Sequence, residues 1–502
     1  MTILTLLERL RELDVRVRLD GERLRVSAPP GVLTPELQRE LAASKRDLIA
    51  LLKAGQTDEA DAPIAHIDAS GPQPLSFTQE RMWLLHELEP ESTAYHLVQI
   101  ERFRGDLDVD ALARAWHGLA ARHDVLRSRV RSANGVPFAL VDDDLQPAAY
   151  RFEDFRGEPE DVVAERARAI VLDESERPFD LATGPLAAMV VIRVAEADHL
   201  VVLRLHHIVT DYWSQGLIRQ ELSALYQSAL SGTPSGLPDL PVRYADFAAW
   251  HRARLEGPEG ERLLGYWRDR LHGLEPLDVS GGLPQADDAV GGGEFRVELP
   301  DGLLDRLNAL ATRSGATLFM TTLAAFAILL FRYSGRTDFS IGTPVAGRTR
   351  REIEPLVGAF INTLVLRLRL RPQTSVREVI DLVRSVALDA FAHGDAPFER
   401  LVAALVPARE ASATPLVQVL FNLLGDQPRT PVFPGLTIEP IGVGRRHAVM
   451  ELALVVNAAD GSVALETRRD LVFGVRPEAV LAHYVGLLEQ VATDPDACIA
   501  TL

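Results

Sequence analysis

The sequence predicts a mixed α/β or α+β protein with a small N-terminal module and a large two-lobed body. Three observations lead to this prediction. The chain has 502 residues, too many for one ordinary domain and enough for two or three. Strand-like alternation and helical periodicity take turns along the body. A stretch without periodicity, rich in acidic residues, Pro and Gly, separates residues 1–55 from the rest.

The composition excludes several classes of protein. Apolar residues make up 47% and charged residues 25%, as in a globular protein. No apolar run reaches the roughly 18 residues of a membrane span, and the N-terminus mixes charges among its apolar residues, unlike a signal peptide. With the single cysteine Cys498, no intrachain disulfide is possible, so we expect a cytoplasmic protein. The net charge of −18 argues against nucleic acid as a partner.

The first 55 residues differ in charge and pattern from the body. They carry ten Lys or Arg and eight Asp or Glu, so they are slightly basic. A helical pattern is followed by "VRVRLDGERLRV", whose Asp-Gly predicts a β-hairpin turn. A second helix is predicted to begin at the N-cap Thr34.

The hairpin arginines form a candidate binding surface. A turn at Asp20-Gly21 would place Arg18 opposite Arg23 and Arg16 opposite Arg25 on one face. Because like charges directly opposite each other are destabilising, this face suggests an acidic partner. The alternative is a solvated face neutralised by nearby acids.

The body shows a regular succession of elements. Residues 187–195 and 199–208 read as neighbouring strands, and the segment around Leu237–Pro241 reads as a loop. Helical periodicity covers four segments: Val109–Arg122, Tyr212–Leu230, Leu303–Tyr333 and Val376–His393.

The segment "LHHIVTDYWS" stands where a strand pattern changes to a helical one. Side chains alternate along a strand, so His206 and His207 should face opposite sides and have different roles. Asp211 occupies the N-cap position of the following helix. A histidine at a strand end can act as a general base because its pKa lies near neutrality. The alternative is a structural histidine pair with a simple Asp cap. No third ligand at suitable spacing supports a metal site.

Seven ordered stretches resemble the motifs of nonribosomal peptide synthetase condensation domains, over about 350 residues. The third, "HHIVTDYWS", resembles the family's HHxxxDG core. The others are "LSFTQERMWLL", "RHDVLRSRV", "YADFAAW", "VGAFINTLVLR", "HGDAPFER" and "REASATPLVQVLFN". Separately, residues 1–55 resemble N-terminal docking domains of the tubulysin-synthetase type.

The resemblance implies an architecture and a reaction. It implies two lobes, each like chloramphenicol acetyltransferase, in a V-shaped pseudo-dimer behind a small αββαα docking domain. The implied divisions are 1–55 for the docking domain, 56–73 for a linker, 74–245 for the N-terminal lobe and 246–502 for the C-terminal lobe. The implied reaction is amide formation in a tunnel between the lobes, where the amine of a carrier-bound acceptor attacks a carrier-bound donor thioester.

The resemblance also assigns roles to particular residues. His207 matches the histidine that the family uses for the amine, whereas His206 and Asp211 match residues with structural roles. Asp211 is expected in a buried ion pair, with Arg348 and Arg367 as the possible partners. Expected packing residues are Ser76, Gln79, Tyr244, Phe247 and Trp250, with Arg122 and Arg127 also structural. Expected tunnel residues are Tyr212, Trp213, Ser214 and Asn362.

One position departs from the family pattern. Tyr212 stands where the family usually has Gly after the aspartate. Three interpretations remain open: altered substrate choice, an unusual donor such as a polyketide chain, or an added dehydration of a Ser- or Thr-derived residue. His206 argues against the heterocyclising branch, which has Asp there.

The resemblance implies partners and no cofactor of the chain's own. Upstream donor and downstream acceptor carrier proteins would supply phosphopantetheine arms, and Arg16, Arg18, Arg23 and Arg25 would bind the acidic C-terminal docking tail of an upstream subunit. The rival functions are a non-catalytic platform that recruits carriers and a freestanding acyltransferase. No adenylation or carrier motif follows, so we expect a piece of a larger synthetase or a short subunit.

Overall fold

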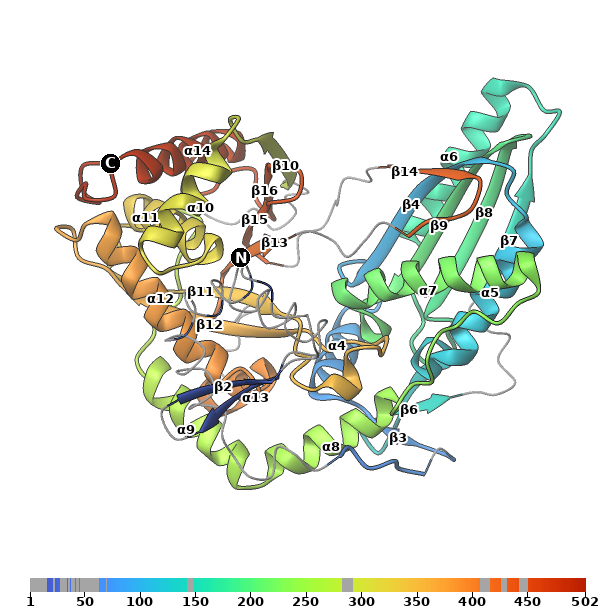
Figure 1. The fold of residues 1–502 in the computed structure, drawn as a ribbon, viewed down its shortest axis with the longest axis horizontal. Coiled ribbons are helices and arrows are strands. Elements are labelled where there is room, and N and C mark those ends of the chain that lie inside the picture. The colour runs from blue at the N-terminus through green and yellow to red at the C-terminus, as the bar shows by residue number, and fades with distance from the viewer. Residues whose placement is uncertain are drawn as a thin grey trace.

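The structure is a computed structural model. It describes residues 16–20, 23–27, 63–68, 70–141, 149–281, 292–406, 416–425, 431–441 and 450–502, and the single positions 34, 37, 41 and 45. Two large sheets lie in two lobes, and helix α8 runs along the base between them (Figure 1).

The N-terminal lobe is built on a five-stranded sheet. Its strands, in spatial order, are β14 (Leu436–Ile441), β4 (His96–Gly105), β9 (Asp198–His206), β8 (Ala187–Ala195) and β7 (Ala149–Asp154). Helices α5 (Val109–Arg122) and α7 (Tyr212–Ser231) cover one face, while α6 (Glu160–Glu176) covers the other. The predicted neighbouring strands are confirmed as the antiparallel pair β8 and β9.

A small sheet and a helix complete the base of this lobe. The sheet has the order β3 (Gln73–Pro74), β6 (Val136–Val141) and β5 (Ser128–Ala133), and the 3₁₀ turn η2 (Asp124–Arg127) precedes β5. Helix α4 (Phe77–Leu88) begins with a capping box, in which Ser76 Oγ accepts from the Gln79 amide and Gln79 Oε1 accepts from the Ser76 amide.

The C-terminal lobe is built on a six-stranded sheet. Its strands, in spatial order, are β10 (Gly293–Glu298), β16 (Ser462–Thr467), β15 (Leu452–Asn457), β13 (Val419–Leu424), β11 (Asp338–Val345) and β12 (Asn362–Arg369). The helices of this lobe are α9 (Pro258–Leu271), α10 (Leu303–Arg313), α11 (Leu318–Ser334), α12 (Val376–Ala392), α13 (Phe398–Leu405) and α14 (Pro477–Thr493). The buried apolar residues centred on the N-terminal lobe form the first core, and those of the C-terminal lobe form the second core. The second core contains the almost wholly buried helix α11.

The predicted helix over Leu303–Tyr333 is wrong in one respect. The chain forms two helices, α10 and α11, bent by 102° at the break between them. Gly315 takes a positive φ of 60°, and Thr317 Oγ1 then caps α11 by accepting from the Met320 amide at 3.2 Å. Continuous apolar periodicity concealed this break because both helices bury their apolar faces in one core.

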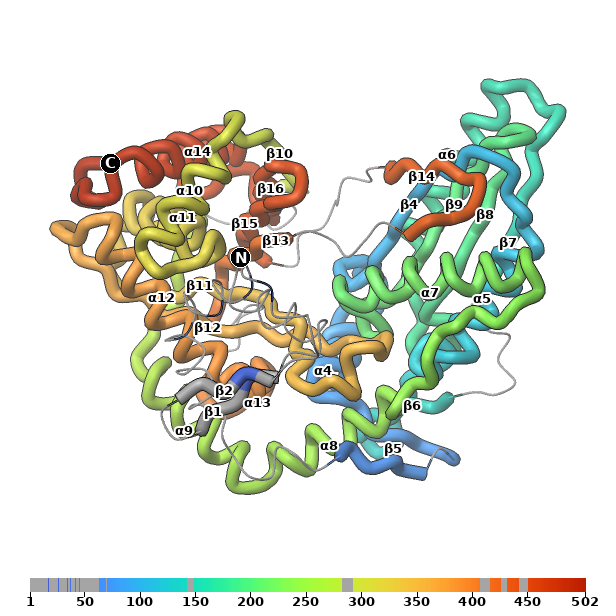
Figure 2. Tube along the Cα trace, in the orientation of Figure 1, coloured from blue at the N-terminus to red at the C-terminus, as the bar shows by residue number. Residues whose placement is uncertain are grey.

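Three segments cross between the lobes. Helix α8 (Tyr244–Glu256) places Tyr244 and Phe247 in the first core and Leu255 in the second. The loop around the 3₁₀ turn η4 (Arg351–Ile353) contributes Phe360 to the first core. Strand β14 leaves the second lobe and pairs with β4; Figure 2 shows it in orange-red beside the blue β4.

These crossings bear on the predicted divisions. Strand β14 lies in the N-terminal sheet, so a single division at 245/246 misplaces it, and α8 itself spans that point. Elsewhere the division stays a prediction. The end of the predicted linker packs on the body, since Ile64 is buried in the first core and the Ile67 amide donates to Asp246 Oδ1 at 2.9 Å.

The hairpin exists, with a different register. Strands β1 (Arg16–Asp20) and β2 (Arg23–Ser27) pair Arg18 with Arg25 and Asp20 with Arg23. The predicted pairs, Arg18 with Arg23 and Arg16 with Arg25, are therefore wrong, because each of these β1 residues pairs two positions further along β2 than predicted. The predicted common face of the arginine side chains lies outside what the structure describes. Thr34 is confirmed as a cap, since its Oγ1 accepts from the Leu37 amide at 3.3 Å.

Candidate active site

The two histidines stand at the change from strand to turn. Strand β9 ends at His206, and the 3₁₀ turn η3 (His207–Val209) begins immediately after it. The Ile208 amide donates to His206 Nδ1 at 3.1 Å, and the His207 amide donates to the Tyr95 carbonyl at 2.9 Å. Because the strand ends at His206, two residues before the predicted end, the turn and not strand alternation orients His207.

His206 is buried among other rings. Its ring centroid lies 5.5 Å from that of Phe179 and 6.2 Å from that of His96, its register partner on β4. Burial, followed by the neighbouring histidines, lowers the pKa of His206 well below its ordinary value. A neutral His206 whose Nδ1 accepts a hydrogen bond carries its proton on Nε2. This environment agrees with a structural role.

His207 is less buried than its neighbour. The Tyr95 ring lies 6.4 Å from the His207 ring, centroid to centroid. Helix α4 supports the turn, since Gln79 Nε2 donates to the Ile208 carbonyl at 3.0 Å. Sequence reasoning assigned Gln79 only to packing between lobes and missed this support. The capping-box pattern "SFTQ" was the available signal, but it does not show what the amide nitrogen contacts.

Asp211 caps helix α7 and reaches the C-terminal half of the chain. Its Oδ1 accepts from the Ser214 amide at 2.8 Å, and its Oδ2 accepts from the Phe360 amide at 3.0 Å. Arg348 Nη2 lies 3.4 Å from Asp211 Oδ1 and donates to Ser214 Oγ at 2.8 Å. The predicted cap is confirmed, and the ion-pair partner is Arg348.

Besides pairing with Asp211, Arg348 holds the loop around η4 that crosses between the lobes. Its Nη1 donates to the carbonyls of Ile353 and Leu356 at 2.6 and 2.7 Å. Its guanidinium carbon lies 4.0 Å from the centroid of the Phe360 ring. Burial lowers the pKa of Arg348, and Asp211 opposes that shift. The other candidate, Arg367, instead pairs with Asp338 at 2.7 Å.

The four expected tunnel residues have unequal environments. Tyr212, the first residue of α7, is 50% exposed. Trp213 Nε1 donates to the Glu354 carbonyl at 3.2 Å, so this side chain joins the lobe contact. Ser214 is fully buried and donates to the Gly358 carbonyl at 2.9 Å. Ser214 therefore belongs to the Asp211 network, and its placement in the tunnel is wrong.

Asn362 holds the loop that carries the "HGDAPFER" motif. Its Nδ2 donates to the carbonyls of Gly394 and Ala396, both at 2.8 Å, and its Oδ1 accepts from the amide of Phe398 at 3.0 Å. The residue also lines a cavity of about 30 Å³ between the lobes. This is room for a water molecule or two and not for a pantetheine arm.

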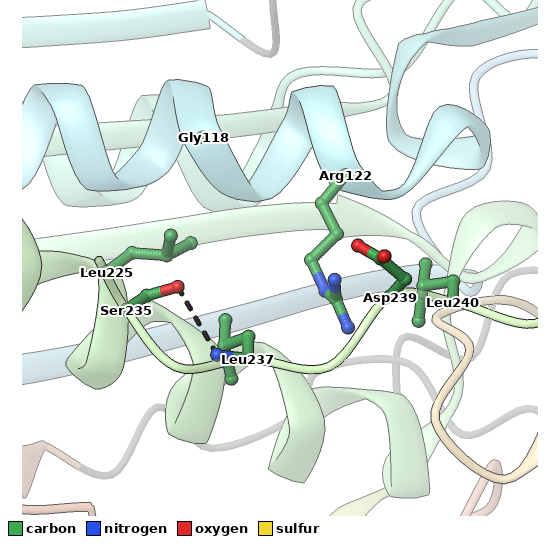
Figure 3. Close-up of a pocket in the computed structure, with 7 residues that line it drawn as sticks. All are labelled: Gly118, Arg122, Leu225, Ser235, Leu237, Asp239 and Leu240. Atoms are coloured by element: carbon green, nitrogen blue, oxygen red, sulfur yellow. Dashed lines mark hydrogen bonds between the residues drawn. The ribbon is translucent and has the colours of Figure 1, made fainter.

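A larger pocket lies away from the histidines. Its volume is about 440 Å³, and it is bordered by α5, α7 and the loop that follows α7 (Figure 3). Arg122 points into this region, where it pairs with Glu221 at 3.0 Å and donates to the Pro238 carbonyl at 2.6 Å. The structural role predicted for Arg122 agrees with these contacts.

The described ranges contain no group of three or more His, Cys, Asp or Glu side chains suited to a metal ion. No single helix among them is long and apolar enough to cross a membrane; α10 and α11 pass that test only as a bent pair.

Two family descriptions match the chain. Residues 69–502 match the family described as Condensation domain, and residues 3–54 match the TubC N-terminal docking domain.

Curated relatives belong to peptide synthetases. One of the linear gramicidin synthase proteins of Brevibacillus parabrevis is 36% identical over 91% of this chain, which covers 9% of that protein. Phosphinothricin tripeptide synthetase PhsC of Streptomyces viridochromogenes is 41% identical over 70% of this chain and 33% of its own length. The chain thus spans a small part of the relatives that it matches.

Solved structures share the fold. The X-domain from teicoplanin biosynthesis superposes with a TM-score of 0.77 at 24% identity, covering 88% of this chain and 99% of that one. The first condensation domain of the calcium-dependent antibiotic synthetase gives 0.71 at 23% identity, covering 86% and 99%. The predicted mixed α/β fold is confirmed, and the chain belongs to the condensation domain family of nonribosomal peptide synthetases, with a TubC-type docking domain matched at its N-terminus.

Proposed function

We propose that this chain forms an amide bond between a carrier-bound donor thioester and the amine of a carrier-bound acceptor. The observation that carries the proposal is the way the protein holds His207. The turn η3 is fixed through Tyr95 and Gln79, next to a buried, neutral His206. A positioned histidine can accept a hydrogen bond or a proton from an attacking amine, and binding both reactants in one site supplies orientation.

In this proposal the residues divide the work. His207 contacts the amine of the acceptor. His206 keeps the turn in place through its bond from the Ile208 amide. Asp211 positions the start of α7 through Arg348, which also secures the loop from the other half of the chain. Tyr212 and Trp213 border the substrate channel, and Asn362 shapes it by holding the motif loop.

The proposed partners follow from the family. Carrier proteins would bring their substrates on phosphopantetheine arms, and the docking domain would bind an upstream subunit. We assign its acidic tail to Arg16, Arg18, Arg23 and Arg25. In the observed strand register Arg18 pairs with Arg25, and Arg23 pairs with Asp20.

A protein-recruiting platform is the second candidate. A solved structure of similar fold, at 26% identity, is the complex of the X-domain and OxyB from teicoplanin biosynthesis. That fold therefore also binds other proteins. The intact arrangement around His207 favours catalysis here.

The test is a reaction between loaded carrier proteins. A donor carrier and an acceptor carrier are mixed with the parent chain, and the acceptor-bound product is followed by intact-protein mass spectrometry. We expect the acceptor carrier to gain the mass of the donor acyl group. His207→Ala should lower the rate of this reaction by about 10²- to 10⁴-fold. His272→Ala, an exposed histidine of the C-terminal lobe, is the matched control and should keep the parent rate.

Other outcomes separate the alternatives. A product lighter by one water would indicate added dehydration, and Tyr212→Gly then tests whether Tyr212 contributes. If the carriers bind but no pair of loaded donor and acceptor carriers gives a product, the protein-recruiting platform is favoured. An active His207→Ala variant would contradict the assigned role.

A further inference from the structure

The larger cavity, bordered by α5, α7 and the loop 232–243 that follows α7, has an apolar wall (Figure 3). Its volume of about 440 Å³ lies in the range of roughly 300–1,000 Å³ that is typical of small-molecule pockets. Leu225, Leu237 and Leu240 line it and are half-buried. Gly118 leaves the α5 side open, since a Cβ at this position would lie 3.5 Å from Leu225 Cδ2. The cavity thus offers apolar surface to a short aliphatic chain.

Arg122 supplies a positive charge to this cavity. Its Nε pairs with Glu221 Oε2 at 3.0 Å, and its Nη2 donates to the Pro238 carbonyl at 2.6 Å. These two contacts fix the direction of a side chain that is only 15% exposed, and Figure 3 shows its guanidinium among the lining residues. In the described part of the chain, Nη1 has no hydrogen-bond partner. Because every guanidinium nitrogen is a donor, Nη1 can donate to a carboxylate that enters the cavity.

Asp239 supplies a negative charge close to Arg122. It directly follows Pro238, whose carbonyl Arg122 contacts, and Figure 3 shows both charged side chains on the same side of the cavity. The side chain of Asp239 is exposed and has no hydrogen-bond or ion-pair partner among the described residues. Ser235 steadies the same loop, since its Oγ accepts from the Leu237 amide at 3.4 Å. A donor, a carboxylate and an apolar wall therefore meet in one cavity.

We propose that this cavity binds an α-amino acid with an aliphatic side chain. The ligand carboxylate accepts from Arg122 Nη1, the ligand ammonium group donates to Asp239, and the aliphatic chain packs on the leucine wall. Charge-assisted hydrogen bonds at both ends favour a zwitterion over a simple acid or amine, and burial of the aliphatic carbons adds affinity. The site is separate from the turn that carries His207, and binding there involves no reaction.

The test compares four probes that differ in single groups. L-leucine has all three recognised features, whereas 4-methylpentanoate lacks the ammonium group, 3-methylbutylamine lacks the carboxylate and glycine lacks the aliphatic chain. Dissociation constants for the parent chain are measured by ligand-detected NMR titration without carrier proteins. We expect L-leucine to bind about fivefold more tightly than 4-methylpentanoate and about tenfold more tightly than the other two probes. Equal dissociation constants, or no detectable binding of L-leucine, would overturn the inference without any variant.

Asp239→Asn locates the binding, because this exposed side chain makes no contact that its replacement would break in the described part of the chain. In this variant L-leucine should bind as weakly as 4-methylpentanoate, whose own dissociation constant stays unchanged. Asp301→Asn, at an exposed aspartate of the C-terminal lobe, is the matched control and should bind L-leucine like the parent.

Two results would place the amino acid elsewhere and contradict the inference. One is an Asp239→Asn variant that binds L-leucine like the parent. The other is a loss of L-leucine binding in His207→Ala, which would assign the ligand to the candidate active site. Because the titration involves no carrier and no turnover, a failure of amide formation would not affect this result.

Discussion

At the scale of single residues, the adjacent histidines occupy opposite environments. His206 ends a buried strand, whereas His207 begins a turn that is partly open. His96 faces His206 across β4 and β9, and burial lowers the pKa of His96 to about 4, helped by the charge of Arg204. The fold therefore keeps a neutral imidazole cluster behind the candidate catalytic residue.

This cluster predicts a loss of stability in acid. A histidine whose pKa is lower in the folded state binds fewer protons there than when unfolded, so stability falls as pH drops from about 6.5 toward 4. His96→Gln removes one of these groups and should flatten the decline in that window. Urea unfolding midpoints measured between pH 7 and 4.5 test this. Equal slopes for parent and variant would show that His96 stays accessible to protons.

At the scale of elements, helix α4 supports the turn η3, which carries His207. Its capping box fixes the Gln79 side chain through Ser76, and the amide nitrogen of that side chain then reaches the Ile208 carbonyl. Tyr244 reinforces the same point by donating to the Ala359 carbonyl at 2.7 Å, with its hydroxyl 2.9 Å from Ser76 Oγ. The N-terminal turn of α4 thereby connects α8, the loop around η4 and the turn η3.

Gln79→Met tests whether Gln79 supports the turn η3, and a substitution in a second capping box serves as its control. Glu378 occupies the same third position in the capping box of α12. Both Gln79→Met and Glu378→Met should lower the free energy of unfolding by about 1 kcal/mol through the lost cap. Gln79→Met should in addition reduce the rate of amide formation by about tenfold, because His207 loses its support. Equal rates in the two variants would refute a positioning role for Gln79.

At the scale of the whole molecule, the C-terminal half completes the N-terminal sheet. Phe433 precedes β14 and packs 5.3 Å from Phe103 and 5.7 Å from Tyr226, centroid to centroid. The Val432 carbonyl accepts from Ser223 Oγ at 2.8 Å. These contacts attach a segment of the second half to β4 and α7 of the first.

Phe433→Ala should release this attachment. Removal of a buried phenylalanine ring costs about 3–5 kcal/mol, and we expect faster hydrogen exchange in β14 and along the neighbouring edge of β4. Val432→Ala is the control, because the Val432 side chain is 73% exposed and its carbonyl contact is retained. Unchanged exchange in Phe433→Ala would mean that strand pairing alone holds β14.

The sequence by itself determined the local features of this protein. Helix α5 matches its predicted bounds, α12 ends within one residue of its bounds, and Asp211 and Thr34 cap the predicted helices. These features depend on periodicity and capping over a few neighbouring residues, so a single chain segment encodes them. The ordered motifs also identified the family, because their order is itself a property of the sequence.

Only the tertiary structure decided which distant groups meet. It chose Arg348 for Asp211, buried Ser214 and gave Gln79 its contact with η3. The ion pair joins residues 137 positions apart, and β14 pairs with a strand from the other end of the body. Such contacts depend on how two lobes pack together, and no local pattern contains that information.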